Sequence, residues 1–85
     1  MQLSNAIRQR ILNLAELKNL KLIELAKAAD VSYSTLISFM VGQTKTLTLN
    51  TLFNLCCGFN IDLVDFFDDE LFRDVVDEHE KNIKF

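Results

Sequence analysis

Apolar residues recur along this chain at intervals of three and four positions, the spacing that places side chains on one face of an α-helix. The pattern predicts a first helix that begins after Ser4 and ends at Asn19, a second over residues 21–29 and a third over residues 33–41. It predicts no strand. The chain is therefore expected to be all-helical.

Two further helices and an amphipathic segment are predicted in the second half of the chain. Thr48 is expected to cap a fourth helix that ends at Asn60 and turns five residues inward: Leu49, Leu52, Leu55, Cys56 and Phe59. Asp62 is expected to cap a short fifth helix. Beyond Asp68, apolar residues at helical spacing stand between acidic ones: Leu71, Phe72, Val75 and Val76, followed by His79. This last pattern predicts an amphipathic C-terminal helix.

Residues suited to helix ends stand between these segments. Ser4 and Ser32 are good N-cap types, because a side-chain oxygen can accept a hydrogen bond from a free amide of the first turn. Asp30 and Asn60 tolerate left-handed backbone better than most residues, and Gly42 adopts it freely. The composition agrees, since a chain of 85 residues with two glycines and no proline favours one domain of helices joined by short turns.

Charge is divided unevenly along the chain. The net charge is −3, but residues 1–50 hold six basic and three acidic residues, whereas residues 51–85 hold three basic and nine acidic ones. This division favours a weakly basic binding part followed by an acidic tail. Because the basic excess is small, any affinity for nucleic acid is expected to be modest. Arg8 and Arg10, on the first helix, are expected to be solvated.

Several classes of function are not supported. Cys56 and Cys57 are adjacent, so they fit neither a disulfide nor a zinc site and are expected to be small, reduced helix residues in the cytoplasm. His79 stands between two glutamates that do not share its helix face, so no metal site is expected. Catalytic Ser–His–Asp or Cys–His arrangements and glycine-rich phosphate loops are not found, and no segment is long enough to span a membrane. We expect neither an enzyme nor a cofactor.

Residues 22–36 carry the pattern most informative about function, two short helical segments separated by a tight turn. Ala26 is small where the two helices would cross, and Val31 can fill the space beneath the turn. Ser32 can cap the second helix. The side chains of that helix's first turn and the positive end of its dipole then face outward, where they can meet an anion.

This segment resembles the phage-repressor-like helix-turn-helix family, the lambda-repressor and Cro type. The matching elements are Leu25-Ala26, Val31-Ser32, Thr35-Leu36, Gly42, Thr48 to Leu52, Leu55-Cys56, Ile61 to Leu63 and Phe66-Phe67. The resemblance covers residues 4–67 and implies an all-α, five-helix repressor-like domain with an extra C-terminal helix. Residues 1–67 would form the DNA-binding domain, and residues 68–85 an acidic amphipathic helix that is a candidate dimerisation segment.

The resemblance implies double-stranded DNA as the partner, with the start of the third helix in the major groove. Contacts to base edges are implied for Ser32, Tyr33, Ser34 and Ser38, and contacts to the DNA backbone for Thr44, Lys45 and Thr46. Each residue also has a simpler interpretation. Ser32 can be a helix cap only, Tyr33 a ring packed on the surface, and the loop a solvated connection.

Three positions depart from the family's usual pattern. Leu22 stands where many members carry glutamine, Asp30 replaces the usual turn glycine, and Ile37 falls at a position that is often polar. Residues 32–41 contain no Arg, Lys, Gln or Asn. Two functions therefore stay open. One is a cytoplasmic, repressor-like transcription regulator that reads a short operator as a homodimer; the other is a protein-interaction module on the same fold that has lost DNA binding.

Overall fold

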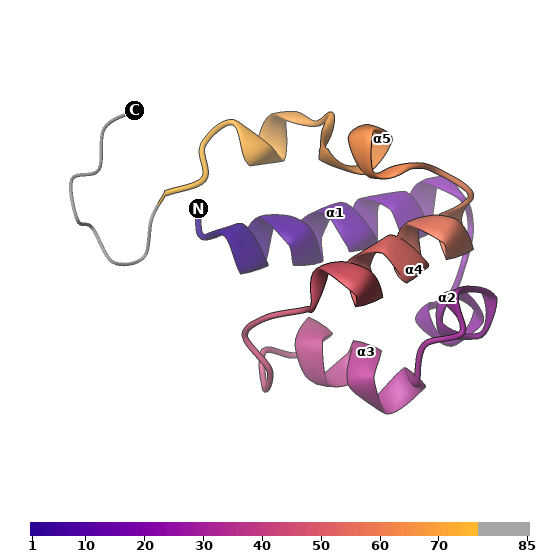
Figure 1. Cartoon of the computed structure of the whole chain (residues 1–85). Helices are drawn as coiled ribbons and strands as arrows, with labels where there is room; N and C mark the ends of the chain where they lie inside the picture. The colour runs from indigo at the N-terminus through magenta and orange to yellow at the C-terminus, as the bar shows by residue number, and fades with distance from the viewer. Residues whose placement is uncertain (77–85) are drawn as a thin grey trace.

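The computed structural model describes residues 1–76. Five α-helices and one 3-10 turn follow one another along the chain (Figure 1): α1 Leu3–Leu17, α2 Leu22–Ala29, α3 Tyr33–Met40, α4 Leu49–Phe59, α5 Leu63–Phe67 and η1 Glu70–Phe72. Within the described residues there is no strand, and one isolated parallel bridge joins Gln2 to Val76. The predicted all-α fold with five helices is confirmed.

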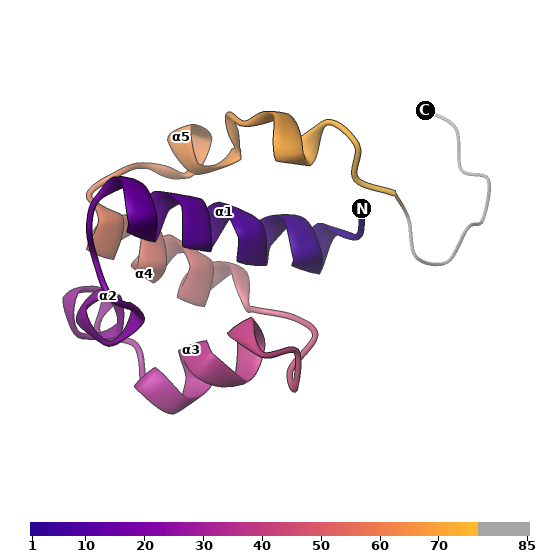
Figure 2. The ribbon, with the colours of Figure 1, turned by 180° about the vertical axis from the view of Figure 1, so that it is seen from behind.

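The helices are stacked so that α3 and the C-terminal segment lie on opposite sides of the molecule (Figures 1 and 2). In the view of Figure 1, α1 and α4 run through the middle, α2 and α3 lie below α4, and α5 with η1 lies above α1. Packing contacts join α2 to both α3 and α4, α4 to α5, and α1 to η1. This arrangement separates the helix-turn-helix from the acidic residues of α5 and η1.

One apolar core connects all five helices. Its largest fully buried side chains are Ile11 from α1, Leu25 from α2, Leu36 and Phe39 from α3, Leu55, Cys56 and Phe59 from α4, and Phe66 from α5. Burying one such side chain contributes roughly 1.5–3 kcal/mol, so this cluster is the main source of stability. Gly58 allows α4 to approach α2 closely, because a Cβ atom there would lie 3.0 Å from both Cβ and the amide nitrogen of Ala29.

Local chemistry sets most of the helix ends as the sequence predicts. The Thr48 hydroxyl accepts a hydrogen bond from the Thr51 amide at 3.0 Å, and the Asp62 carboxylate accepts one from the Asp65 amide at 2.7 Å. Asp30 and Asn60 end α2 and α4 in the left-handed conformation, with φ of 56° and 62°. A short polar side chain thus replaces glycine at both ends.

Two local expectations are wrong. Helix α1 begins at Leu3 with Gln2 in the N-cap position, so Ser4 lies inside the helix rather than at its cap. The reason is that the amide of Ala6 already donates to the carbonyl of Gln2 at 3.0 Å, which starts the helical ladder earlier. Leu49, expected to face inward, is 69% exposed because it is the first residue of α4 and precedes the packed part of that helix.

The chain after α5 does not begin the amphipathic α-helix expected over residues 68–85. In its described part the only helical element is the single turn η1, and the Asp69 carboxylate caps that turn by accepting a hydrogen bond from the Leu71 amide at 2.9 Å. The amide of Val76 then donates to the carbonyl of Met1 at 3.1 Å. The remainder of the predicted helix, residues 77–85, lies outside the described residues.

Part of the apolar stripe predicted in this segment packs on the chain's own domain. The ring of Phe72 lies 5.8 Å from that of Phe66 and 4.8 Å from that of Phe67, centroid to centroid. Aromatic pairs at such distances stabilise beyond the area they bury. The described C-terminal segment therefore shares a hydrophobic cluster with α5, which explains why a turn that folds back replaces a projecting helix.

Arg10, expected to be solvated, fixes this segment in place. Its guanidinium donates to the carbonyls of Phe66 and Asp65, both at 2.8 Å, and to the Asp69 carboxylate at 3.1 Å. The side chain of Arg10 is only 14% exposed and that of Asp69 29%, so the ion pair is partly shielded from water. One arginine on α1 thus ties down the end of α5 and the start of η1.

We expect Arg10→Met to destabilise the fold by about 1–3 kcal/mol, because it removes a charged donor from partly buried acceptors. The measurement is the free energy of unfolding from urea denaturation followed by circular dichroism. Arg73→Met is the matched control, since Arg73 is an exposed arginine of the same segment, and it should change stability by less than about 0.5 kcal/mol. Equal stability of the two variants would show that Arg10 is not a structural tie.

Candidate nucleic-acid interface

Helices α2 and α3 form a helix-turn-helix in which the turn is closed by backbone hydrogen bonds. The amide of Val31 donates to the carbonyl of Ala26 at 2.9 Å, and the left-handed Asp30 donates to that of Lys27 at 3.2 Å. Ala26 is buried, and Val31 is half-buried against the core, as expected from the motif. The turn therefore holds the start of α3 in a fixed orientation to α2.

The start of α3 is open to solvent. Ser32, Tyr33 and Ser34 are all exposed, and Tyr33 retains 46% of its accessible surface. Ser32 occupies the N-cap position, but its hydroxyl lies 3.0 Å from that of Ser34 and accepts no bond from the first turn. The expected side-chain cap is thus absent, because the two serine hydroxyls pair with each other. The free amides and the positive end of the α3 dipole are left facing outward.

Ser38 differs from the other three residues predicted to reach base edges. It lies one turn after Ser34, which places the two side chains on the same face of α3. It is half-buried rather than exposed, and its carbonyl accepts a hydrogen bond from the Thr44 amide at 3.1 Å. Ser38 therefore joins the end of α3 to the loop that follows it.

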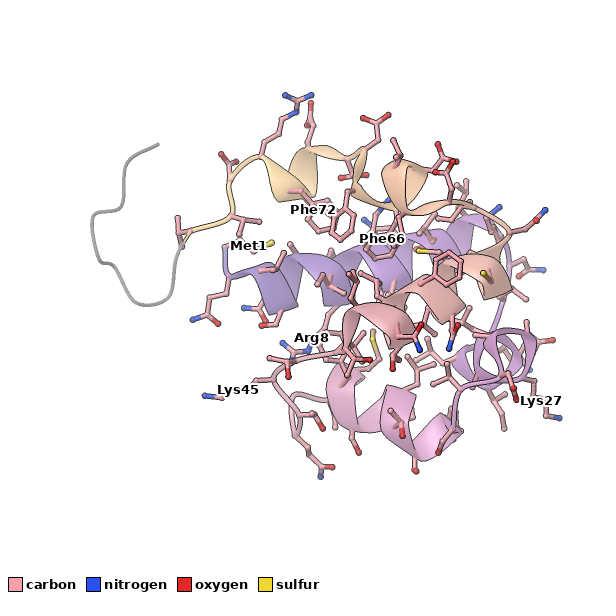
Figure 3. All side chains as sticks on the ribbon, in the orientation of Figure 1. Met1, Arg8, Lys27, Lys45, Phe66 and Phe72 are labelled. Atoms are coloured by element: carbon pink, nitrogen blue, oxygen red, sulfur yellow. The ribbon has the colours of Figure 1, made fainter. Side chains whose placement is uncertain are left out.

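The loop after α3 presents the predicted backbone-contacting residues on its surface. Gly42 starts it with φ of 86°, a conformation that favours glycine. The side chains of Thr44, Lys45 and Thr46 are exposed. In Figure 3, Lys45 extends away from the body of the molecule on one side of α3, and Lys27 of α2 does so on the other. Two lysines thus flank the exposed face of α3.

Arg8 is the residue that sequence reasoning missed. It was expected to be solvated, but its guanidinium donates to the carbonyl of Phe39 at 2.6 Å and to that of Thr44 at 3.1 Å. The only signal in the sequence is its place three residues before the buried Ile11, at the edge of the apolar stripe of α1. The side chain in Figure 3 reaches from α1 toward the base of the Lys45 loop.

Two departures from the family's pattern have a structural role. Leu22 is partly buried and packs against the core, and Ile37 is half-buried. Neither side chain is left fully on the surface. Asp30 takes the left-handed turn position that glycine usually fills. These substitutions therefore support packing and the turn, and they leave the exposed residues of α3 and the loop as the surface available to a partner.

A shallow groove runs beside the turn. It is lined by Ile23, Ala26, Lys27, Asp30, Val31, Ser32 and Tyr33. Residues 1–76 hold no group of three side chains placed to bind a metal ion. Burial raises the pKa of the Cys56 thiol to about 11, so that thiol stays protonated and unreactive at neutral pH.

No helix in the described part of the chain is long and apolar enough to cross a membrane. Comparison with curated proteins and with solved structures gave no significant match. The sequence model of the helix-turn-helix family matches residues 11–66, which is well over half of the chain and runs from the second half of α1 into α5. The order of helices and the exposed start of α3 agree with that match. The chain therefore belongs to the phage-repressor-like helix-turn-helix family, whose members are DNA-binding transcription regulators.

Proposed function

We propose that this protein is a repressor-like transcription regulator that binds a short operator in double-stranded DNA. In this proposal the start of α3 enters the major groove, where Ser32, Tyr33 and Ser34 meet base edges. The loop residues Thr44, Lys45 and Thr46 contact the phosphate backbone and set the register. We infer that it acts in the cytoplasm, as a binding protein rather than an enzyme.

The observation that carries the proposal is the separation of charge across the molecule. Lys27 and Lys45 flank the exposed face of α3, whereas the acidic residues at positions 62–74 lie on or beside α5 and η1, on the opposite side of α1 (Figures 1 and 3). A polyanion that approaches α3 therefore meets these two lysines on the side away from α5 and η1, where the exposed Asp30 of the turn is the nearest acidic residue in the sequence. This arrangement supports DNA binding despite a net charge of −3.

Binding to duplex DNA in a salt series tests the proposal directly. One duplex has random sequence, and the other is enriched from a randomised library by binding to this protein. We expect the logarithm of the affinity to fall linearly with the logarithm of salt concentration for both, because counterions are released, with tighter binding to the enriched duplex. Absence of binding to either duplex at low salt would overturn the proposal.

A second function, protein interaction without DNA binding, is favoured by one observation. Helix α3 lacks every residue type that makes bidentate contacts to bases, since it contains no Arg, Lys, Gln or Asn. Serine and tyrosine hydroxyls provide weaker discrimination. Absence of binding to either duplex at low salt would support this second function in place of the first.

We further propose that the protein forms a homodimer through its C-terminal segment and the adjoining outer face of α5. A helix-turn-helix monomer reads few base pairs, and two copies on half-sites one helical turn apart combine their contacts. Val64 is 77% exposed and Phe67 38%, and their spacing puts them on one face of α5. Phe67 also contacts Phe72, so this face continues into the C-terminal segment.

Lys45→Ala should weaken binding to all duplexes by a similar factor and lower the slope of the salt dependence by about 0.9, the share of one phosphate contact. Fluorescence anisotropy with labelled duplexes measures both quantities. Lys18→Ala is the matched control, because it removes one exposed cation at the end of α1, outside both the helix-turn-helix and the C-terminal segment. If Lys45→Ala and Lys18→Ala give the same affinity and slope, Lys45 makes no contact with DNA.

Val64→Glu should convert the dimer to a monomer, because it places a charge in an apolar interface. Analytical ultracentrifugation of the full chain at micromolar concentration reports the mass. Val41→Glu is the control, since Val41 is also well exposed, at 63%, but follows α3 on the other side of the molecule. A wild-type chain that sediments as a monomer at high micromolar concentration would rule out a stable dimer, and an unaffected Val64→Glu variant would place the interface elsewhere.

A further inference from the structure

The guanidinium of Arg8 joins three separate parts of the chain. Nε donates to the carbonyl of Phe39 at 2.6 Å, one Nη donates to that of Thr44 at 3.1 Å, and the other donates to the side-chain oxygen of Asn5 at 2.9 Å. The guanidinium carbon also lies 4.6 Å from the centre of the Phe39 ring. Asn5 belongs to α1, Phe39 to the last turn of α3 and Thr44 to the loop, so a single side chain sets their relative positions.

Two of these acceptors lie where a cation is most useful. The carbonyl of Phe39 is among the last four of α3, which carry the negative end of its dipole, and besides Arg8 it accepts a hydrogen bond from the Gly42 amide at 3.1 Å. The carbonyl of Thr44 belongs to a loop, where backbone acceptors otherwise bond to water. The planar, charged guanidinium can donate to two carbonyls at once, so it suits these two acceptors better than a neutral side chain does.

Thr44 is held from both sides. Its amide donates to the carbonyl of Ser38, and its own carbonyl accepts from Arg8. The backbone of the loop is therefore anchored at the residue before Lys45, while the side chains of Thr44, Lys45 and Thr46 remain exposed. A loop fixed in one conformation before binding loses less conformational entropy when it meets its ligand.

We propose that Arg8 is a positioning residue for the phosphate contact, which it serves by holding the Thr44–Thr46 loop without touching DNA itself. This inference rests on the proposed function, since it concerns the same DNA-binding surface. Helix α1, which is not part of the helix-turn-helix, thereby gains a role in binding. The Arg8 guanidinium serves this role through the carbonyls to which it donates and does not extend into solvent beside Lys45.

The chain provides its own control. Arg10 lies two residues further along α1, which turns it about 200° around the helix axis. It makes the same kind of contact, with two carbonyls and a side-chain oxygen, but on the C-terminal segment. Substituting either arginine removes the same charge and a similar number of bonds. Of these two arginines, only Arg8 is bonded to the loop.

The experiment is a double-mutant cycle on duplex affinity in the full chain, with Arg8→Met, Lys45→Ala and the double variant. We expect Arg8→Met to weaken binding about as much as Lys45→Ala, and the double variant to bind no more weakly than the weaker single one, because a loop out of place has already lost the lysine contact. The slope of the salt dependence in the double variant should be lower than in the wild type by about 0.9, the same reduction as in each single variant. Arg10→Met can weaken binding through the C-terminal segment of the proposed dimer, but its effect should add to that of Lys45→Ala, because Arg10 is not bonded to the loop.

Each other outcome contradicts a definite part of the inference. Additive effects of Arg8→Met and Lys45→Ala, with two reductions in slope, would mean that Arg8 contacts phosphate directly. Wild-type affinity in Arg8→Met would mean that the loop needs no anchor. A wild-type chain that binds no duplex would overturn the proposed function and this role with it, which distinguishes that failure from the previous two.

Amide hydrogen exchange reports the anchor without DNA. In Arg8→Met the Thr44 amide should exchange faster relative to the core amides, and in Arg10→Met it should not. Unchanged protection at Thr44 would overturn the anchor. If Arg8→Met fails to fold, Arg8→Lys is used in the same cycle, because lysine keeps the charge but cannot present a planar fork to two carbonyls. It should show the same non-additivity with a smaller loss of affinity.

Discussion

Helix α1 supplies hydrogen-bond donors to the ends of two other helices, and the arrangement of the molecule depends on those bonds. A helix leaves its last carbonyls without intrahelical partners, and short helices such as α3 and α5 have few turns in which to absorb that cost. Arg8 donates to the end of α3 and Arg10 to the end of α5. Because both side chains start from one rigid helix, the loop after α3 and the segment after α5 are fixed relative to each other.

This arrangement gives the protein two faces of different character. One face carries the exposed start of α3 with Lys27 and Lys45 at its sides (Figure 3). The other carries α5 and η1, where Arg10 and Phe72 hold an acidic segment against α1. A chain with a net charge of −3 can thus present exposed lysines beside α3.

Most of the fold that depends on residues close together in the chain was predictable from the sequence, although the caps expected at Ser4 and Ser32 were not found. The caps at Thr48 and Asp62 and the left-handed ends at Asp30 and Asn60 were all identified, because each depends on a side chain and the backbone beside it. The packing of Ala26 and Val31 beneath the turn was likewise predicted. Helical spacing is also a local property, which is why the five helices were found.

Features that depend on distant residues could not be predicted in the same way. Residues 68–76 have the spacing of an amphipathic helix, but Phe72 packs on Phe66 and Arg10 bonds Asp69, and these tertiary contacts fix a turn instead. The roles of Arg8 and Arg10 were missed for the same reason, since five of their six acceptors lie 31 to 59 residues away along the chain. For the site, sequence reasoning found the exposed surface residues but not the side chain that anchors them.

The most direct test of the account is an amide chemical-shift titration of the isotope-labelled full chain with a short duplex. The amides of residues 32–38 and 43–46 should show the largest chemical-shift changes, and those along α5 and η1 should show small ones. The largest shifts at residues 62–76, or no shifts at all at low salt, would contradict the claim that the start of α3 and the loop anchored by Arg8 form the DNA-binding face.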